Sequence, residues 1–220
     1  MPSRMLAGFG LLLALLLIDL VVVIGVGEPS AVSRATQLVV AGATLALAGF
    51  GSRVSGRLSW TVTLVAAIVV VLGIFVLTTG LDEHVPGATE IAAAGLYGIG
   101  ALACSARVLR QERVSLETIL GALSVYLLLA FAFGAVFSAI QAITGEPFFT
   151  QLDGPAGVAD FLYFSLVTLT TLGYGDLTSG LSAGRAASAL EAVVGQLFLA
   201  TFVARTVGAF ATVRRSGGDT

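Results

Sequence analysis

Six apolar stretches dominate this chain, and each is long enough, or nearly so, to cross a lipid bilayer. A helix needs about 20 apolar residues for that crossing, because each residue advances it by ~1.5 Å. A scan at this length predicts spans at Leu6–Val26, Ala35–Phe50, Leu58–Gly80, Gly87–Ala106, Leu116–Ile140 and Arg185–Val213. The second is the shortest, and its ends are poorly marked. The pattern predicts an all-α membrane protein with six transmembrane helices.

The composition argues against a soluble protein. Hydrophobic residues make up 57% of the chain and charged residues only 11%, whereas a soluble domain has about 25% charged residues. The single cysteine, Cys104, excludes an internal disulfide and makes a zinc site unexpected. No basic run is long enough to bind nucleic acid. The first stretch could be a signal peptide, but it exceeds the usual apolar core and lacks a small-residue cleavage site, so we expect a retained span.

The arginines predict the orientation of the spans. If the N-terminus is cytoplasmic, the inner loops hold eight arginines and the outer loops two, Arg34 and Arg185. The inner set is Arg4, Arg53, Arg57, Arg107, Arg110, Arg113, Arg214 and Arg215. An excess of arginine on the cytoplasmic side is the usual signature of membrane topology. We therefore expect a multi-pass protein of the cell membrane with both termini in the cytoplasm.

A shorter apolar segment, Ala159–Thr170, lies between the fifth and sixth spans, and its length suits a helix that enters the membrane without crossing it. The stretch TLTTLGYGD, Thr168–Asp176, overlaps its end. Irregular backbone at membrane depth is tolerated only where it is buried in protein or lines a watery cavity. Alternate glycines permit left-handed conformations at alternate residues, so that successive carbonyls can point the same way. Four such segments around an axis would form rings of oxygens for a large monovalent cation.

This stretch resembles the T-x-x-T-x-G-Y-G-D signature of potassium channels. The matching residues are Thr168, Thr171, Gly173, Tyr174, Gly175 and Asp176. The resemblance implies that backbone carbonyls from Thr171 to Gly175 form the selectivity filter, with K⁺ held at Thr171, Leu172, Gly173 and Tyr174. The permeant K⁺ ions are the only bound species expected, and no cofactor is implied.

The resemblance extends over about Leu116–Val213 and implies further roles. Gly195 is a candidate hinge of the inner helix, although close packing between helices explains a glycine there equally well. Thr168, Asp176 and Tyr163 are expected to support the filter, with the Tyr163 hydroxyl in reach of Asp176. Val167 stands where some bacterial channels have a glutamate that pairs with the signature aspartate, so that pair is absent.

Six spans suggest a voltage-sensor-like domain at residues 1–113, a pore domain at 114–213 and a short tail at 214–220. Arg107, Arg110 and Arg113 have the spacing of sensor arginines, but they follow the apolar part of the fourth span. A charge that crosses the membrane field contributes about 2.3 kcal/mol per 100 mV to gating. A charge that lies outside this field contributes little. We expect weak voltage dependence or none.

Three charged residues lie within predicted spans, where such residues usually face the protein interior and find partners. Glu191 is expected to brace the region behind the filter. Asp19 could be a counter-charge or could reach the interface. Arg205 could reach the inner membrane face or pair with a neighbour. Structural roles are expected for all three.

One filter segment per chain cannot surround an ion, so the chain is expected to form a homotetramer in the lipid bilayer. The expected function is passive, K⁺-selective conduction, with no enzymatic activity. An alternative is a cation channel of relaxed K⁺/Na⁺ selectivity, because of Leu172 and the missing glutamate. A transporter subunit and a non-conducting scaffold are further alternatives. The sequence does not identify the stimulus that opens the pore.

Overall fold

The computed structural model describes residues 2–26, 38–44, 64, 67–68, 70–71, 75, 78, 87–111 and 114–216, with side chains from Phe9 to Val207 at the two ends. Its helices are α1 (Pro2–Val26), α4 (Ala88–Leu109), α5 (Leu116–Thr144), α6 (Val158–Leu169) and α7 (Ser182–Ser216). Residues 38–44 are also helical. The only β-type pairing within this described part is an isolated bridge between Phe149 and Ser179. The all-α prediction is confirmed for these residues.

Three of the predicted spans correspond to helices that are long and apolar enough to cross a membrane: α4, α5 and the Ser182–Val207 part of α7. Helix α1 covers the first predicted span. The second and third predicted spans lie largely outside the described residues. Helix α6 has 12 residues and matches the predicted short helix, beginning one residue earlier and ending one residue earlier.

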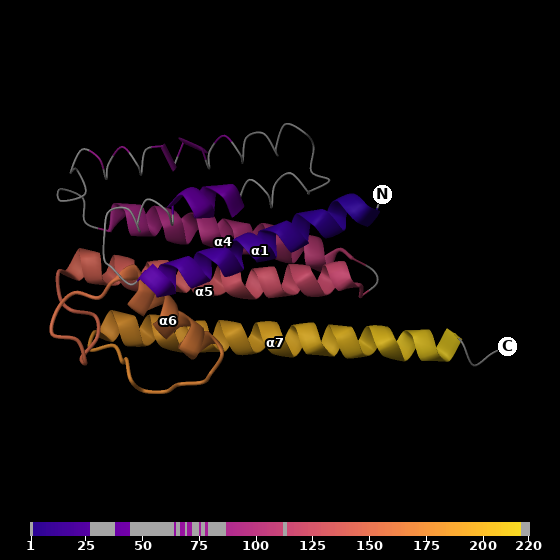
Figure 1. The fold of residues 1–220 in the computed structure, drawn as a ribbon. Coiled ribbons are helices and arrows are strands. Elements are labelled where there is room, and N and C mark those ends of the chain that lie inside the picture. Colours follow the sequence, from indigo (N-terminus) through magenta and orange to yellow (C-terminus); the bar gives the residue numbers. More distant parts are fainter. Residues whose placement is uncertain are drawn as a thin grey trace.

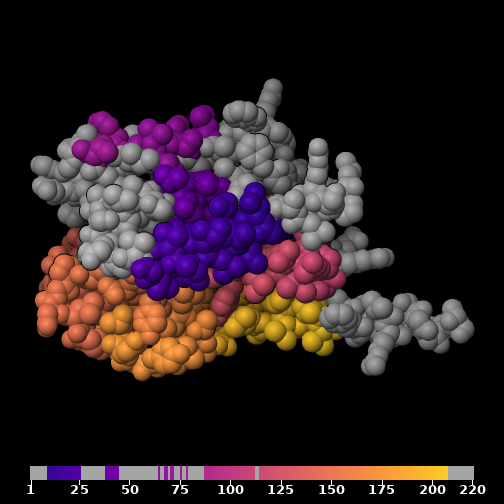
Figure 2. Space-filling model, in the orientation of Figure 1, coloured from indigo at the N-terminus to yellow at the C-terminus, as the bar shows by residue number. Residues whose placement is uncertain are grey.

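The helices pack around α5. Helices α1 and α4 lie along one side of it, α7 lies along the other, and the short α6 sits between α5 and α7 (Figure 1). The N-terminal end of α1 and the C-terminal end of α7 lie on the same side of the molecule, opposite the loops that flank α6 (Figure 1). In the space-filling view, the α6 region and α7 form one edge of the subunit (Figure 2).

The main core lies where α1, α4 and α5 meet. Its fully buried side chains include Phe9, Leu16, Tyr97, Leu128 and Phe131. The rings of Tyr97 and Phe131 lie 5.1 Å apart between centroids. The same core receives Leu162 from α6. The peripheral helices and the short helix therefore share one packed interior.

Asp19 is buried in this core, with 4% of its surface exposed. The Tyr97 hydroxyl donates a hydrogen bond of 3.5 Å to its Oδ2 atom. The expectation that Asp19 could reach the membrane interface is therefore wrong. A carboxyl in a dry interior costs free energy unless it has hydrogen-bond partners, and Tyr97 on α4 supplies one.

The turn between α4 and α5 is defined by polar contacts. Ser115 and Thr118 form a capping box, with bonds of 3.4 Å and 3.1 Å between side chains and backbone amides. The Thr118 hydroxyl also donates to Gln111 Oε1 at 2.5 Å. Arg205 of α7 donates to the carbonyl oxygen of Gln111. Of the two expectations for Arg205, the structure therefore favours pairing with a neighbour.

Arg107 lies in the last turn of α4 and packs over the ring of Phe9 on α1, with its guanidinium carbon 4.3 Å from the ring centroid. A cation over an aromatic face is stabilised by the ring quadrupole. Arg110 forms the C-cap of the helix and is exposed. Arg113 lies outside the described residues. Arg107 is thus held at the end of the helix next to α1.

If the protein conducts ions, as the resemblance to potassium channels implies, we predict that Arg107→Gln leaves its conductance–voltage relation unchanged. The reason is that a cation at the helix end moves through little of the membrane field, at about 2.3 kcal/mol per charge per 100 mV for a full crossing. Single-channel recording over a range of voltages checks this. A steep relation in the wild type that flattens in the variant would show that Arg107 carries gating charge.

Candidate functional site: the filter segment and its supports

The segment Thr171–Gly175, called here the filter segment, has alternating backbone handedness. Positive φ angles occur at Thr171 (58°), Gly173 (55°) and Gly175 (78°), with Leu172 and Tyr174 between them outside that region. The glycines were expected to allow this alternation. Thr171 was not expected to have a positive φ angle, because a β-branched residue rarely adopts a left-handed conformation. The alternation therefore begins at Thr171, two residues before the first of these glycines.

The amides of the filter segment turn toward α6. Leu172 N and Gly173 N both donate to the carbonyl oxygen of Val167, at 3.0 and 3.3 Å, and Thr171 N donates to Thr168 O at 3.0 Å. Within the described part of the chain, the carbonyl oxygens of Thr171 to Gly175 accept no hydrogen bond. Buried backbone carbonyls in a protein are nearly always paired. If these five oxygens are enclosed at membrane depth, they therefore need a partner from outside the subunit.

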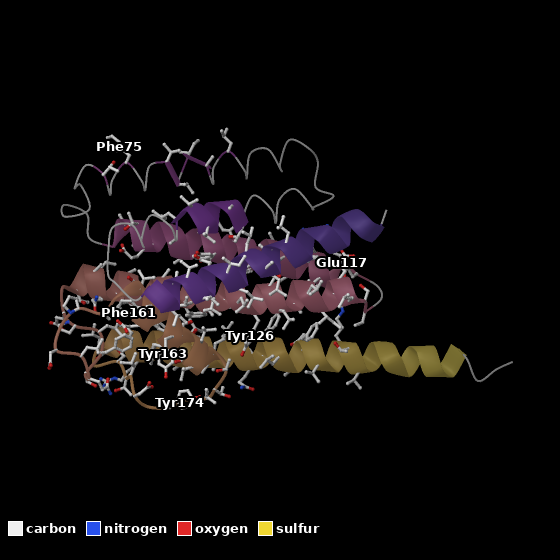
Figure 3. All side chains as sticks on the ribbon, in the orientation of Figure 1. Phe75, Glu117, Tyr126, Phe161, Tyr163 and Tyr174 are labelled. Atoms are coloured by element: carbon white, nitrogen blue, oxygen red, sulfur yellow. The ribbon has the colours of Figure 1, made fainter. Side chains whose placement is uncertain are left out.

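The side chains next to these carbonyls are also uncovered. Every residue from Thr170 to Asp176 is exposed in the single subunit, including Leu172 at 57% and Tyr174 at 66%. Figure 3 shows Tyr174 at the edge of the molecule, beyond α6 and α7. Inside the subunit, Gln196 of α7 donates a hydrogen bond of 3.4 Å to the Thr171 hydroxyl. The filter segment is therefore anchored on one side and open on the other.

Helix α6 is fixed at both ends. Asp160 accepts a hydrogen bond of 2.9 Å from Gly157 N and so caps the start of the helix. At its other end, the Tyr126 hydroxyl on α5 donates to the carbonyl oxygen of Leu169 at 2.8 Å. Tyr126 lies between α5 and α7 (Figure 3), and its ring stacks with Phe198 at 5.8 Å. Tyr126 was not among the residues predicted for the site, although a tyrosine in an apolar span usually finds a hydrogen-bond partner.

An aromatic cluster supports the N-terminal half of α6. Its members are Phe137, Phe148, Phe149, Phe161 and Phe164, and Figure 3 marks Phe161 among them. Several pairs adopt the edge-to-face arrangement that aromatic rings prefer, with centroids about 5 Å apart. Two of these rings come from the loop at residues 145–157, which joins α5 to α6. The adjacent Phe148 and Phe149 were the signal in the sequence that part of it is buried.

Gln141 of α5 holds this loop in place. A short backbone pairing joins the loop to the chain beyond the filter segment. The Gln141 amide bonds Phe148 N, Ala156 N and Ala156 O at 3.2, 3.0 and 3.1 Å. Thr150 N donates to Thr178 O at 3.1 Å, and Gly180 N to Phe148 O at 3.0 Å. The C-terminal end of the filter segment is therefore held by the loop before α6. Neither Gln141 nor this pairing was predicted.

Tyr163 and Asp176 form a direct contact. The Tyr163 hydroxyl donates to Asp176 Oδ2 at 2.6 Å, and Leu177 N donates to Asp176 Oδ1 at 3.1 Å. The hydrogen bond to Asp176 is the main cause that raises the pKa of Tyr163 to about 12. The hydroxyl is therefore protonated and able to donate at neutral pH. The expected geometry is present, and the role of this pair in filter support stays a prediction.

We predict that Tyr163→Phe weakens the filter without altering the subunit fold. The variant keeps the ring and removes only the donor to Asp176, whose carboxylate follows the last filter residue. We expect a several-fold faster loss of current during sustained opening, measured in bilayer recordings. Equal decay in wild type and Tyr163→Phe would contradict the supporting role.

Gly195 contacts the end of α6. A Cβ atom added there would lie 2.8 Å from both Leu169 O and Leu169 Cδ1. This close approach agrees with the packing explanation for the glycine. Its role as a hinge stays a prediction.

Glu191 is fully buried and faces α6, where its carboxyl group contacts the Ser165 hydroxyl. It therefore lies behind the helix that leads into the filter segment. Among the described residues, no three His, Cys, Asp or Glu side chains gather to hold a metal ion.

Comparison with known proteins places the chain in a family. A family model described as "ion channel" matches residues 125–212. Protein LctB of Bacillus caldotenax is 32% identical over 123 residues, which cover 53% of this chain and 90% of that protein. The chain belongs to an ion channel family. The matched region of the channel includes most of α5, all of α6, the filter segment and most of α7. No solved structure matches the channel.

Proposed function

We propose that the protein is a K⁺-selective channel, in which four copies of the chain surround one pore and ions move passively through it. The observation that supports this most strongly is the filter segment, with alternating handedness and five carbonyl oxygens that accept no hydrogen bond in the described part of the chain. Carbonyl oxygens at these positions can replace the water around an ion. K⁺ is the substrate, held at Thr171, Leu172, Gly173 and Tyr174.

The uncovered surface of the single subunit supports the proposed tetramer. Exposed apolar side chains on α7 include Leu190, Val193, Leu197, Val203 and Val207. Lipid can cover such side chains, but it cannot satisfy the polar carbonyls of the filter segment. Fourfold assembly brings these carbonyls to a common axis and gives Leu172 and Tyr174 a neighbouring subunit to pack against.

The topology that we propose has six spans, with residues 1–113 as a peripheral domain, 114–213 as the pore domain and 214–220 as a tail. Both termini lie in the cytoplasm of a cell-membrane protein. This agrees with the distribution of arginines and with α1 and α7 having their N- and C-terminal ends, respectively, on the same side (Figure 1).

The proposal is tested by recording from purified full-length protein in planar bilayers, with K⁺ on one side and Na⁺ on the other. We expect a reversal potential close to the K⁺ equilibrium value. A reversal potential near zero would favour the cation channel of relaxed selectivity. Flux that saturates and depends on a second ion would favour a transporter subunit. If the complete tetramer shows no ion flux, the result would favour the non-conducting membrane scaffold.

A further inference from the structure

Three helices meet at one hydroxyl group behind the filter segment. Ser165 of α6 is fully buried, and its Oγ atom lies 2.8 Å from the carbonyl oxygen of Ala130 on α5. The same Oγ atom contacts Oε1 of Glu191 on α7. Glu191 is also fully buried, and its Oε2 atom has no hydrogen-bond partner among the described residues.

A count of hydrogens decides how these groups pair. A serine hydroxyl has one hydrogen to donate, yet Ser165 Oγ contacts two acceptors, the Ala130 carbonyl and the Glu191 carboxyl group. If Glu191 were a carboxylate, the single hydroxyl hydrogen could lie in only one of these two short oxygen–oxygen contacts, and the other would have none. If Glu191 is a neutral carboxylic acid, it donates to Ser165 Oγ, and Ser165 donates to Ala130. Only the neutral acid gives each contact its own hydrogen.

Among the residues that the structure describes, no cation lies close enough to stabilise a carboxylate at Glu191. Tyr126, on α5, is the titratable neighbour on that side, and its hydroxyl is bonded to a backbone carbonyl. On α6, Asp160 and Tyr163 are engaged with Gly157 N and Asp176. On α7, Arg185 lies six residues earlier and is exposed. A buried charge without a partner costs several kcal/mol, so a buried group in this position neutralises instead.

We propose that Glu191 is a protonated carboxylic acid that donates to Ser165, and that this relay from α7 through α6 to α5 positions the filter. Ser165 lies two residues before Val167, whose carbonyl oxygen accepts the amides of Leu172 and Gly173. A shift of α6 at Ser165 therefore moves the acceptor of two filter amides. The protonation of Glu191 is argued from its contacts with Ser165 alone. Its effect on selectivity rests on the proposed channel function.

Infrared spectroscopy tests the proton without requiring any current. We expect wild-type protein at neutral pH to show the C=O stretch of a protonated carboxylic acid that disappears in Glu191→Gln. Asp19→Asn, at the other buried carboxyl group, should leave that band in place. Ser165→Ala should shift the band, because the acid loses its acceptor. A wild-type spectrum with no band that Glu191→Gln removes would overturn the protonation.

Ion selectivity tests the positioning. Glutamine has nearly the shape of the neutral acid and keeps an N–H donor, so Glu191→Gln should retain the wild-type K⁺/Na⁺ permeability ratio. Glu191→Ala and Ser165→Ala should each lower that ratio about tenfold, equivalent to ~1.4 kcal/mol. The double alanine variant should be no worse than either single one, because both remove the same relay.

The outcomes separate the two proposals. If Glu191→Gln lowers the permeability ratio as much as Glu191→Ala, the proposal that a neutral Glu191 donates to Ser165 is wrong. If Glu191→Ala, folded and tetrameric by size-exclusion chromatography, keeps the wild-type ratio, the positioning role is wrong. If the wild type conducts no K⁺, the proposed channel function fails, and the infrared band still decides the protonation of Glu191.

Discussion

Replacing Gly173 with alanine is expected to abolish K⁺-selective current. Gly173 has a φ angle of 55°, and a residue with a side chain pays about 1–2 kcal/mol in the left-handed region. In a tetramer, four copies would together pay about 4–8 kcal/mol. The strain is relieved if the peptide flips, which turns a carbonyl oxygen away from the ion. The measurement is the reversal potential of the variant under opposed K⁺ and Na⁺ gradients.

A second glycine separates backbone strain from steric conflict. A Cβ atom at Gly173 would meet no atom within 4 Å in the subunit, and the same holds at Gly154, which does not have a positive φ. Gly154→Ala should therefore retain wild-type selectivity. Selective K⁺ current in a Gly173→Ala tetramer would show that the filter segment has been assigned to the wrong residues.

The second large effect is expected at Gly195, where alanine should lower the stability of the protein and disturb the filter. The added Cβ would lie 2.8 Å from the carbonyl oxygen of Leu169. That oxygen belongs to the backbone and also accepts the Tyr126 hydrogen bond, so it cannot move aside freely. Overpacking of this kind costs about 1–3 kcal/mol, which outweighs the ~1 kcal/mol that alanine gains over glycine in a helix.

Thermal unfolding of the purified tetramer measures this effect. Gly95→Ala on α4 is the matched control, because Gly95 is helical, exposed and without an atom within 4 Å of an added Cβ. If Gly195→Ala leaves the melting temperature at the wild-type value and changes only the opening of the pore, Gly195 acts as a hinge. A lowered melting temperature supports close packing against α6.

The sequence predicted the parts of this structure that depend on local pattern. Apolar length was enough to find α4, α5 and α7, because the membrane requires a minimum span. The short length of α6 was equally informative. The signature residues located the filter segment, and alternate glycines predicted its backbone handedness.

The contacts that hold the filter segment were harder to predict because they join residues far apart in the chain. The Tyr126 hydroxyl and the Leu169 carbonyl are 43 positions apart, and Gln141 reaches Ala156 across a loop. Hydropathy identifies a span but not which of its faces meets a neighbour. Asp19 illustrates the same limit, because only the three-dimensional packing of α1 against α4 decides whether it faces Tyr97 or the membrane interface.

The shared acceptor at Val167 has a consequence for how the pore can vary. Because the two filter amides bind a main-chain oxygen, the side chain at position 167 takes no part in these bonds and can change without breaking them. The donors at Leu172 and Gly173 are equally independent of side-chain type, and only proline lacks the N–H that they require. At this point the short helix and the filter segment are thus connected by main-chain atoms alone, so these two bonds set no requirement on the side chain at position 167.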